Sequence, residues 1–132
     1  MLTADFAYNE AAFDQWAQTA QAPAIPGTLR LYKEAQKLGV SVLFVTGRSD
    51  KLRAATERNL RAQGFKKWDL LVMRPAAHGS QTIGEFKQAA RRQIATAGYT
   101  LALNVGDQWS DLKGEPEAEY SVKYPDPYYL IP

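Results

Sequence analysis

The sequence predicts an α/β fold in which a parallel sheet carries helices on both faces. Short apolar segments alternate with amphipathic helical segments along all 132 residues, and neither an internal repeat nor a Gly/Ser-rich linker divides the chain. Glycines follow the ends of the helical segments, as is common at helix C-termini. Strands that alternate with helices in this way pair in parallel, since each helix returns the chain to the same end of the sheet.

The composition is that of one globular domain, which we expect to span residues 1–132. Hydrophobic residues make up 45% and charged residues 23%, which excludes collagen-like and wholly disordered chains. A net charge of +2 is too small to indicate a nucleic acid or an anionic membrane as partner. The absence of cysteine excludes disulfides, thiolate metal sites and cysteine nucleophiles.

The amino terminus carries no recognisable targeting signal. Residues Met1–Asp5 lack the basic start and the apolar stretch of a signal peptide. The longest apolar run, Val40–Val45, is far shorter than the ~20 residues that a membrane span needs. As written, the chain is expected in the cytoplasm.

Two helices and a strand are predicted before residue 50. The first helix spans residues 9–20, with Asn9 as a plausible N-cap, and a proline-containing segment at 22–27 ends it. A second helix begins at Thr28 and ends at the next glycine. The strand that follows, Val40–Val45, is apolar and β-branched, as expected for a strand covered on both faces.

The same alternation continues through the rest of the chain. The next helix is capped by Ser49 or Asp50 and ends at Gln63, and another is opened by Ser80 or Thr82. Three further strands are predicted, at Leu70–Met73, Tyr99–Val105 and Tyr120–Tyr124. In parallel sheets functional residues lie at the carboxyl ends of strands. The segments to inspect are therefore Thr46–Arg48, Arg74–Pro75 and Gly106–Gln108.

The end of the first strand offers groups that can hold a phosphate. Thr46 supplies a hydroxyl, and the Gly47–Arg48 backbone supplies N–H groups beside a helix start. The same residue types also occur in an ordinary strand-to-helix turn with a capping residue, which is the commoner case.

Two further clusters carry charge. Lys87 and Arg91 are one helical turn apart and place two cations on one face, which can bind an anion or form a solvated basic face. Asp107 and Asp111 follow a predicted strand with the spacing that lets two carboxylates share a Mg²⁺ ion. Alternatively, Asp107 or Ser110 caps a short helix and Asp111 is solvated.

Taken together, the three strand ends resemble the haloacid dehalogenase superfamily, most closely its acid phosphatase branch. That branch includes bacterial outer-membrane lipoprotein acid phosphatases and plant vegetative storage proteins. The resemblance implies a Rossmann-like parallel sheet and equates residues 5–26 with the family's helical insertion. It is carried by residues 22–27, 44–48 and 56–60, Phe86–Lys87 with Arg91, and residues 104–112 and 124–129.

The resemblance also implies roles for individual residues. Thr46, with Gly47 and Arg48, would bind the phosphoryl group of a small phosphorylated molecule. Lys87 would neutralise the charge of the phosphate and contribute to catalysis. Asp107 and Asp111 would surround Mg²⁺ or another divalent metal, with Asp107 the better ligand, and all four side chains would converge in one pocket.

One family motif is missing from the sequence. The first motif, Asp-x-Asp-x-Thr, supplies the nucleophile and the general acid/base, and no Asp-x-Asp occurs in the 132 residues. The resemblance therefore implies an amino-terminally truncated chain that lacks the central strand between those ending at Thr46 and Gly106. We expect the aspartyl-phosphate route to be absent and any metal to bind weakly.

Two functions remain open. The chain is either a phosphatase-family hydrolase with weak hydrolysis, rerouted through a metal-activated water, or a non-catalytic phosphate-binding remnant of the fold. Nucleic-acid binding through Lys66, Lys67, Arg91 and Arg92 is disfavoured, since aromatic residues are not interleaved with these cations. A homodimer or larger oligomer is expected to cover the missing-strand position. Intact relatives are usually periplasmic, outer-membrane or secreted.

Overall fold

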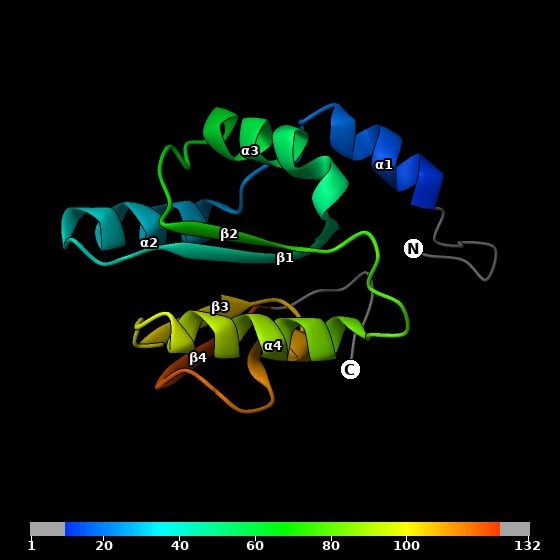
Figure 1. Ribbon diagram of the computed structural model, residues 1–132. Helices are drawn as coiled ribbons and strands as arrows, with labels where there is room; N and C mark the ends of the chain where they lie inside the picture. Colours follow the sequence, from blue (N-terminus) through cyan, green and yellow to red (C-terminus); the bar gives the residue numbers. More distant parts are fainter. Residues whose placement is uncertain (1–9, 125–132) are drawn as a thin grey trace. The chain divides into compact units, whose positions relative to one another are not determined.

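The computed structural model describes residues 10–124 of the chain. The chain divides between Ala76 and Ala77 into two compact units, which are described here in turn. The first unit contains α1 (Glu10–Gln18), α2 (Pro26–Lys37), β1 (Leu43–Ser49), the 3-10 helix η1 (Asp50–Leu52), α3 (Arg53–Ala62) and β2 (Leu70–Arg74) (Figure 1). The second contains α4 (Ile83–Thr96), β3 (Leu103–Gly106), α5 (Trp109–Leu112) and β4 (Tyr120–Lys123).

In the first unit, β1 and β2 form a parallel pair, as the sequence predicted. The register runs from Leu43 opposite Leu70 to Thr46 opposite Met73. A bulge follows, because the next paired residue of β1 is Ser49, opposite Arg74. The residues between Thr46 and Ser49 therefore lie at an irregularity of the strand rather than in a regular ladder.

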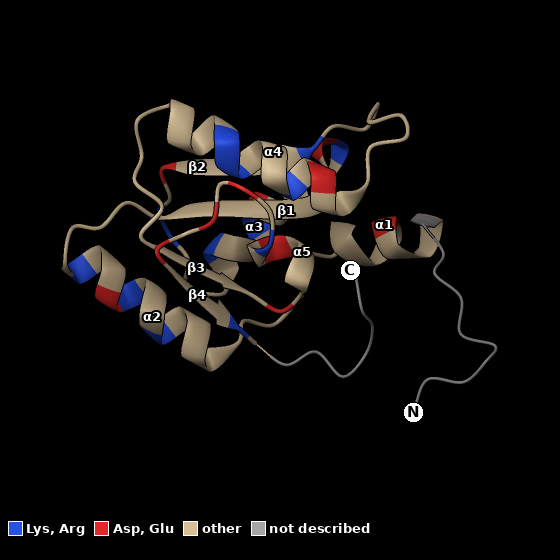
Figure 2. Ribbon diagram, turned by 90° about the horizontal axis from the view of Figure 1, so that it is seen from below, with Lys and Arg blue, Asp and Glu red and all other residues tan. Residues whose placement is uncertain are grey.

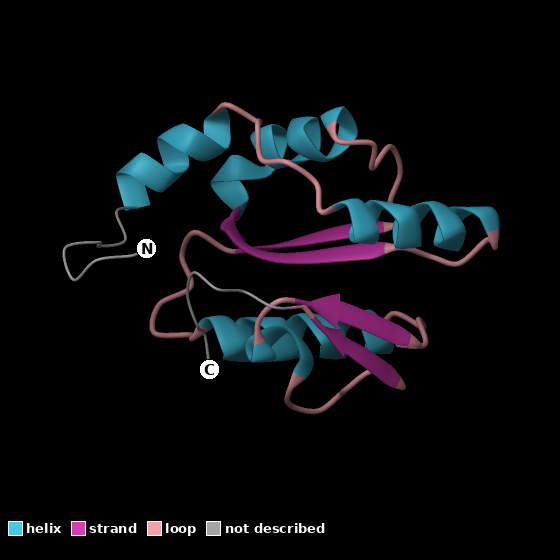
Figure 3. Cartoon of the chain, turned by 180° about the vertical axis from the view of Figure 1, so that it is seen from behind, coloured by secondary structure: helices cyan, strands magenta, loops and turns pink. Residues whose placement is uncertain are grey.

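The core of the first unit lies between its helices and this pair of strands. Helix α3 covers one face of the pair, and α1 packs against α3 and η1 (Figures 1 and 3). Leu52 is only 1% exposed and packs with other buried apolar side chains from α1 and β2, namely Ala17, Leu71 and Met73. Partly buried hydrophobic side chains surround this cluster: Phe13, Phe44, Leu60 and Trp68.

The connection from α1 to α2 is fixed by Asn59 of α3 and by Gln63, which follows that helix. Asn59 accepts the Ala22 N–H at 3.0 Å and donates to the Ala22 carbonyl at 2.8 Å. The Gln63 amide oxygen accepts the Ala24 N–H at 3.0 Å. Asn59 is buried because both of its polar groups are satisfied by this backbone, as burial of an amide requires.

In the second unit, β3 and β4 are parallel, with Leu103 opposite Tyr120 and Gly106 opposite Lys123. The short helix α5 contacts α4 and both strands. Helix α4 begins with a capping box in which Thr82, rather than Ser80, is the N-cap and Glu85 closes the box. The buried apolar side chains come from α4 and α5: Phe86, Ala90, Ile94 and Leu112.

The predicted starts of three elements were wrong by two to four residues. Helix α2 begins at Pro26 instead of Thr28, because the fixed φ of proline suits the first turn of a helix. The first strand begins at Leu43 and not Val40, since the pairing with β2 begins there and Val42 instead bonds to Asp69.

The third boundary is that of β3, which begins at Leu103 and not at Tyr99. The Tyr99 N–H returns to the Ile94 carbonyl at the end of α4, and the Ala102 N–H bonds to the Thr100 carbonyl. Residues 99–102 therefore form the loop between α4 and β3, in which the carbonyls of Leu101 and Ala102 accept bonds from Glu119 and Tyr120. The predicted N-cap Asn9 lies outside the described residues.

Each pair of strands keeps an edge without a strand partner in the described part of the chain. Between residues 10 and 124, β1 bonds only to β2 and β3 only to β4. On β3 and β4, large apolar side chains remain exposed at Leu103, Val122 and Tyr120, the last of them 73% exposed. None of the helices within residues 10–124 is both long and apolar enough to cross a membrane.

Candidate functional site

The first group of predicted site residues lies at the bulge of β1. Thr46 was expected after the strand, but β1 continues through Gly47 and Arg48 to Ser49. The Thr46 hydroxyl oxygen accepts the Arg48 N–H at 3.2 Å, which fixes the turn of the bulge. The hydroxyl proton of Thr46 can still be donated to a ligand oxygen. Ser49, not Asp50, accepts a cap bond at the start of the helical segment that follows.

The side chain of Arg48 is directed toward α1 and α3. Its guanidinium carbon lies 5.7 Å from the ring centre of Phe13 and 5.6 Å from that of Trp16, and it donates to the Thr56 hydroxyl at 3.3 Å. Burial lowers the pKa of Arg48 from its usual value. This predicted phosphate ligand therefore contributes to the packing of the first unit through cation–π contacts.

In the second unit, Lys87 and Asp111 meet as an ion pair. Lys87 comes from α4 and Asp111 from α5, and the Lys87 Nζ donates to the Asp111 Oδ1. The side chains are 12% and 16% exposed, respectively, so water screens this pair far less than a surface pair. The prediction that Asp111 could be a solvated carboxylate was wrong, since α4 packs against α5 and brings Lys87 to it.

The second carboxylate oxygen of Asp111 caps its own helix. Asp111 Oδ2 accepts the N–H of Gln108, and the Gln108 side chain caps α5 in a capping box. The cap is therefore Gln108, not Asp107 or Ser110. Gln108 is buried. Glutamine is not among the residues preferred at an N-cap, so the sequence pattern did not single it out.

Gly106 makes room for this arrangement. A Cβ atom built at Gly106 would lie 2.5 Å from both the Cβ and the Oδ2 of Asp111. Such distances are well inside van der Waals contact, so a side chain at residue 106 would displace the carboxylate.

Arg91 has a different environment from the one predicted. It is 4% exposed, so the prediction of a solvated basic face was wrong for this residue. Its guanidinium donates to backbone carbonyls of residues 111–116. Because its guanidinium is enclosed, Arg91 is not available to contact a nucleic acid, a partner that the sequence already disfavoured. Along α2, the acidic Glu34 lies between basic residues (Figure 2).

Asp107 is partly buried and directly follows β3. Its carboxylate is of the oxygen type that Mg²⁺ prefers, and Mg²⁺ is often held by one or two carboxylates with water and substrate phosphate as the other ligands. Within residues 10–124 no cluster of three or more His, Cys, Asp or Glu side chains could hold a metal. The donors present therefore fit a metal that depends on water and phosphate oxygens for the rest of its ligands.

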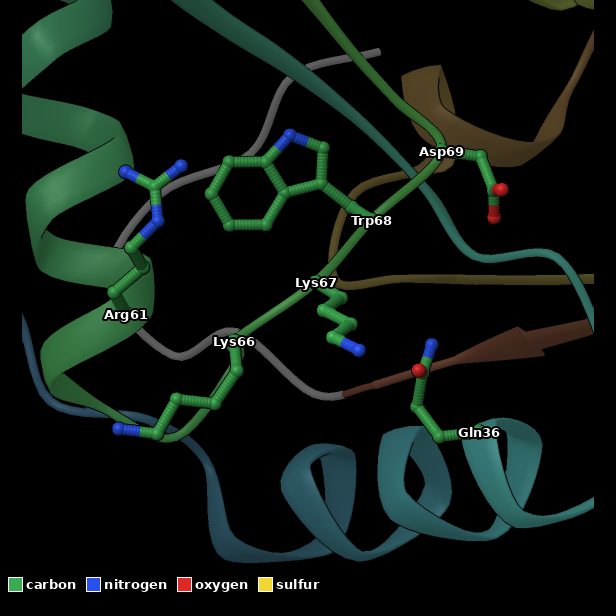
Figure 4. Close-up of a pocket in the computed structure, with 6 residues that line it drawn as sticks. All are labelled: Gln36, Arg61, Lys66, Lys67, Trp68 and Asp69. Atoms are coloured by element: carbon green, nitrogen blue, oxygen red, sulfur yellow. The ribbon is translucent and has the colours of Figure 1, made fainter.

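A second group of cations surrounds a pocket of about 450 Å³ in the first unit. The residues that line it come from α2, α3 and the segment before β2: Gln36, Arg61, Lys66, Lys67, Trp68 and Asp69. Arg61 lies over the Trp68 ring, 4.8 Å from its centre, while the ammonium groups of Lys66 and Lys67 point in different directions (Figure 4). The cations that line this pocket therefore do not converge on a single ligand position. The pocket lies before the start of β2, whereas the Thr46 bulge lies beside Met73, near the end of that strand.

Comparison with solved structures supports the α/β class that the two units define. The chain resembles the class C acid phosphatase from Bacillus anthracis with a TM-score of 0.74 and 21% identity, over 92% of this chain and 56% of that one. The structure of the same phosphatase with tungstate bound gives the same TM-score at 20% identity. At this level of identity the likeness concerns the fold.

Sequence comparison gives the family. The pattern of the HAD superfamily, subfamily IIIB (Acid phosphatase), matches residues 4–132, and the chain belongs to this family. Acid phosphatase 1 of Solanum lycopersicum is 37% identical over 94% of this chain and 49% of its own length. The stem 28 kDa glycoprotein of Glycine max is 35% identical over 94% and 50%, and vegetative storage protein 1 of Arabidopsis thaliana is 33% identical over 92% and 44%.

The predicted resemblance to acid phosphatases and vegetative storage proteins is confirmed by these matches. The chain spans about half the length of the curated relatives it matches. Members of this family generally depend on a divalent metal.

Proposed function

We propose that this chain binds the phosphoryl group of a small phosphate monoester and hydrolyses it weakly, with the help of a divalent metal. The observation that carries the proposal is the partly buried Lys87–Asp111 pair beside the carboxyl end of β3 in a chain of the acid phosphatase family. A cation fixed by a carboxylate in a poorly screened place can neutralise the charge of a phosphoryl oxygen.

Each residue of the site has a proposed role. Lys87 binds a phosphoryl oxygen through its ammonium group. The Thr46 hydroxyl of the first unit is a separate candidate donor to a ligand oxygen. Asp107 holds the metal, which supplies Lewis-acid polarisation of the ester when bound. Asp111 already uses its carboxylate oxygens on Lys87 and Gln108, so we assign it chiefly to holding Lys87.

The test is hydrolysis of a chromogenic phosphate ester with and without Mg²⁺, on the wild-type chain and on Asp107→Asn. We expect slow, metal-dependent turnover without an aspartyl-phosphate intermediate, because the sequence contains no Asp-x-Asp. Loss of a nucleophile and its partner acid costs several powers of ten in rate by analogy with other catalytic units. Asp107→Asn should reduce the remaining rate about tenfold or more, since a bound metal is worth several kcal/mol.

The outcomes of this assay separate the alternatives. Fast turnover that Asp107→Asn leaves unchanged would place the chemistry elsewhere. Absence of turnover with inorganic phosphate still bound would select the non-catalytic phosphate-binding function.

A second copy of the chain is the proposed protein partner. Among residues 10–124, one edge of β1 and one of β3 have no strand partner, and Leu103 and Tyr120 are exposed; pairing with another chain would cover these backbone and apolar groups. Sedimentation at micromolar concentration is expected to give at least twice the mass of the 14.7 kDa chain. A species of 14.7 kDa that unfolds cooperatively would contradict this prediction.

A further inference from the structure

The buried guanidinium of Arg91 holds the segment that contains Asp111. Its Nη1 donates to the Asp111 carbonyl at 2.6 Å and its Nε to the Pro116 carbonyl at 2.8 Å. Its Nη2 donates to the carbonyls of Lys113 and Gly114. These carbonyls belong to the end of α5 and the turn after it, where no helical N–H is available to them. One side chain thus satisfies carbonyls of four different residues.

Asp111 connects this arrangement to the phosphate site. Its carbonyl is held by Arg91 and also by the Asn104 Nδ2 at 2.8 Å, while its carboxylate pairs with Lys87. Lys87 and Arg91 are one turn apart on α4, so the same helix holds both ends of Asp111. A shift of the Asp111 backbone would therefore carry its carboxylate away from the Lys87 ammonium.

Only arginine has the geometry for this role. A guanidinium presents five N–H donors in a rigid plane, whereas a lysine ammonium is a compact group with three. Burial lowers the pKa of Arg91, and the carboxylates of Glu117 and Asp111 act in the opposite direction. The guanidinium stays charged throughout the physiological range.

We propose that Arg91 is a positioning residue that fixes the phosphate-binding ammonium of Lys87 by holding the backbone of Asp111. The phosphate-binding part of this inference rests on the proposed function, while the placement of Lys87 can be tested independently of it. Arg92, the next residue on α4, provides a matched control because it is exposed and reaches only the Glu115 carbonyl, at 3.4 Å, among the contacts of the described chain.

The experiment compares Arg91→Lys with Arg92→Lys on the full chain. One measurement is the dissociation constant of inorganic phosphate by calorimetric titration. The other is the rate of reductive methylation of Lys87, followed by mass spectrometry with exposed Lys66 as internal standard. Arg91→Lys should weaken phosphate binding about tenfold and speed methylation of Lys87 several-fold, because small displacements of a binding group are costly. Arg92→Lys should change neither.

Unchanged methylation of Lys87 in folded Arg91→Lys would overturn the inference, as would equal changes in both variants. If wild-type chain binds no phosphate, the proposed function fails, and faster methylation of Lys87 in Arg91→Lys still supports the positioning role. If circular dichroism shows that Arg91→Lys does not fold, Arg91→Gln replaces it, since a glutamine amide can still donate hydrogen bonds but has only two N–H groups for the carbonyls that Arg91 holds. Unchanged methylation of Lys87 in folded Arg91→Gln would then overturn the inference.

Discussion

Lys87→Met is expected to weaken the binding of inorganic phosphate by roughly 10- to 100-fold, since a hydrogen bond to a charged group is worth about 1.5–3 kcal/mol. Methionine keeps most of the length of the side chain but removes its charge. The Asp111 carboxylate then loses its cation and repels the incoming phosphate, which adds to the effect. If the wild-type chain turns over a phosphate ester, the variant should lose about two powers of ten in rate, as is typical for removal of one charge-stabilising donor.

Lys66→Met is the matched control for this prediction. Lys66 is exposed and lines the pocket before β2 in the first unit, so its substitution changes the net charge equally and leaves both residues of the Lys87–Asp111 pair in the sequence. Calorimetric titration of both variants with phosphate separates a specific site from general electrostatic attraction. Equal weakening in the two variants would show that phosphate senses only the overall charge.

Gly106→Ala is expected to destabilise the second unit by about 1–3 kcal/mol, the usual cost of forcing extra atoms into a packed site. The new methyl group would meet Asp111 at 2.5 Å, so the carboxylate must leave either Lys87 or the Gln108 N–H. Urea denaturation measures the loss of stability. Amide hydrogen exchange at Gln108 reports whether its bond to Asp111 has opened, and phosphate binding should weaken in the same variant.

Gly27→Ala provides the comparison for a glycine without such a contact. Its Cβ would come no closer than 3.9 Å to another group, and the residue lies in the first turn of α2. Alanine is the better helix former by up to about 1 kcal/mol, so this variant should be neutral or slightly stabilising. A Gly106→Ala chain as stable as Gly27→Ala, with unchanged exchange at Gln108, would contradict the steric role of Gly106.

The sequence alone determined the order of the elements and the family. Apolar runs bounded by glycine and capping residues placed the four strands and the helices α1–α4 within a few residues, because local propensity and hydrophobic period depend on neighbouring residues. The short helix α5 was only an alternative interpretation of residues 107–111. Boundaries were less secure, since the start of β1 depends on where Leu70 of β2 begins to pair with Leu43, a contact distant in sequence. The segments around Thr46, Lys87 and Asp107 were sufficient for the resemblance that the comparisons confirm.

Only the tertiary structure decided what the charged side chains do. Lys87 and Arg91 have the same spacing as any pair on a basic helical face, yet one forms an ion pair with Asp111 and the other is enclosed among backbone carbonyls. The packing of α4 against α5 makes that difference, because it removes both cations from water and forces them to find partners. The need for glycine at residue 106 likewise arises from the Asp111 side chain that folds back over it, which no local pattern encodes.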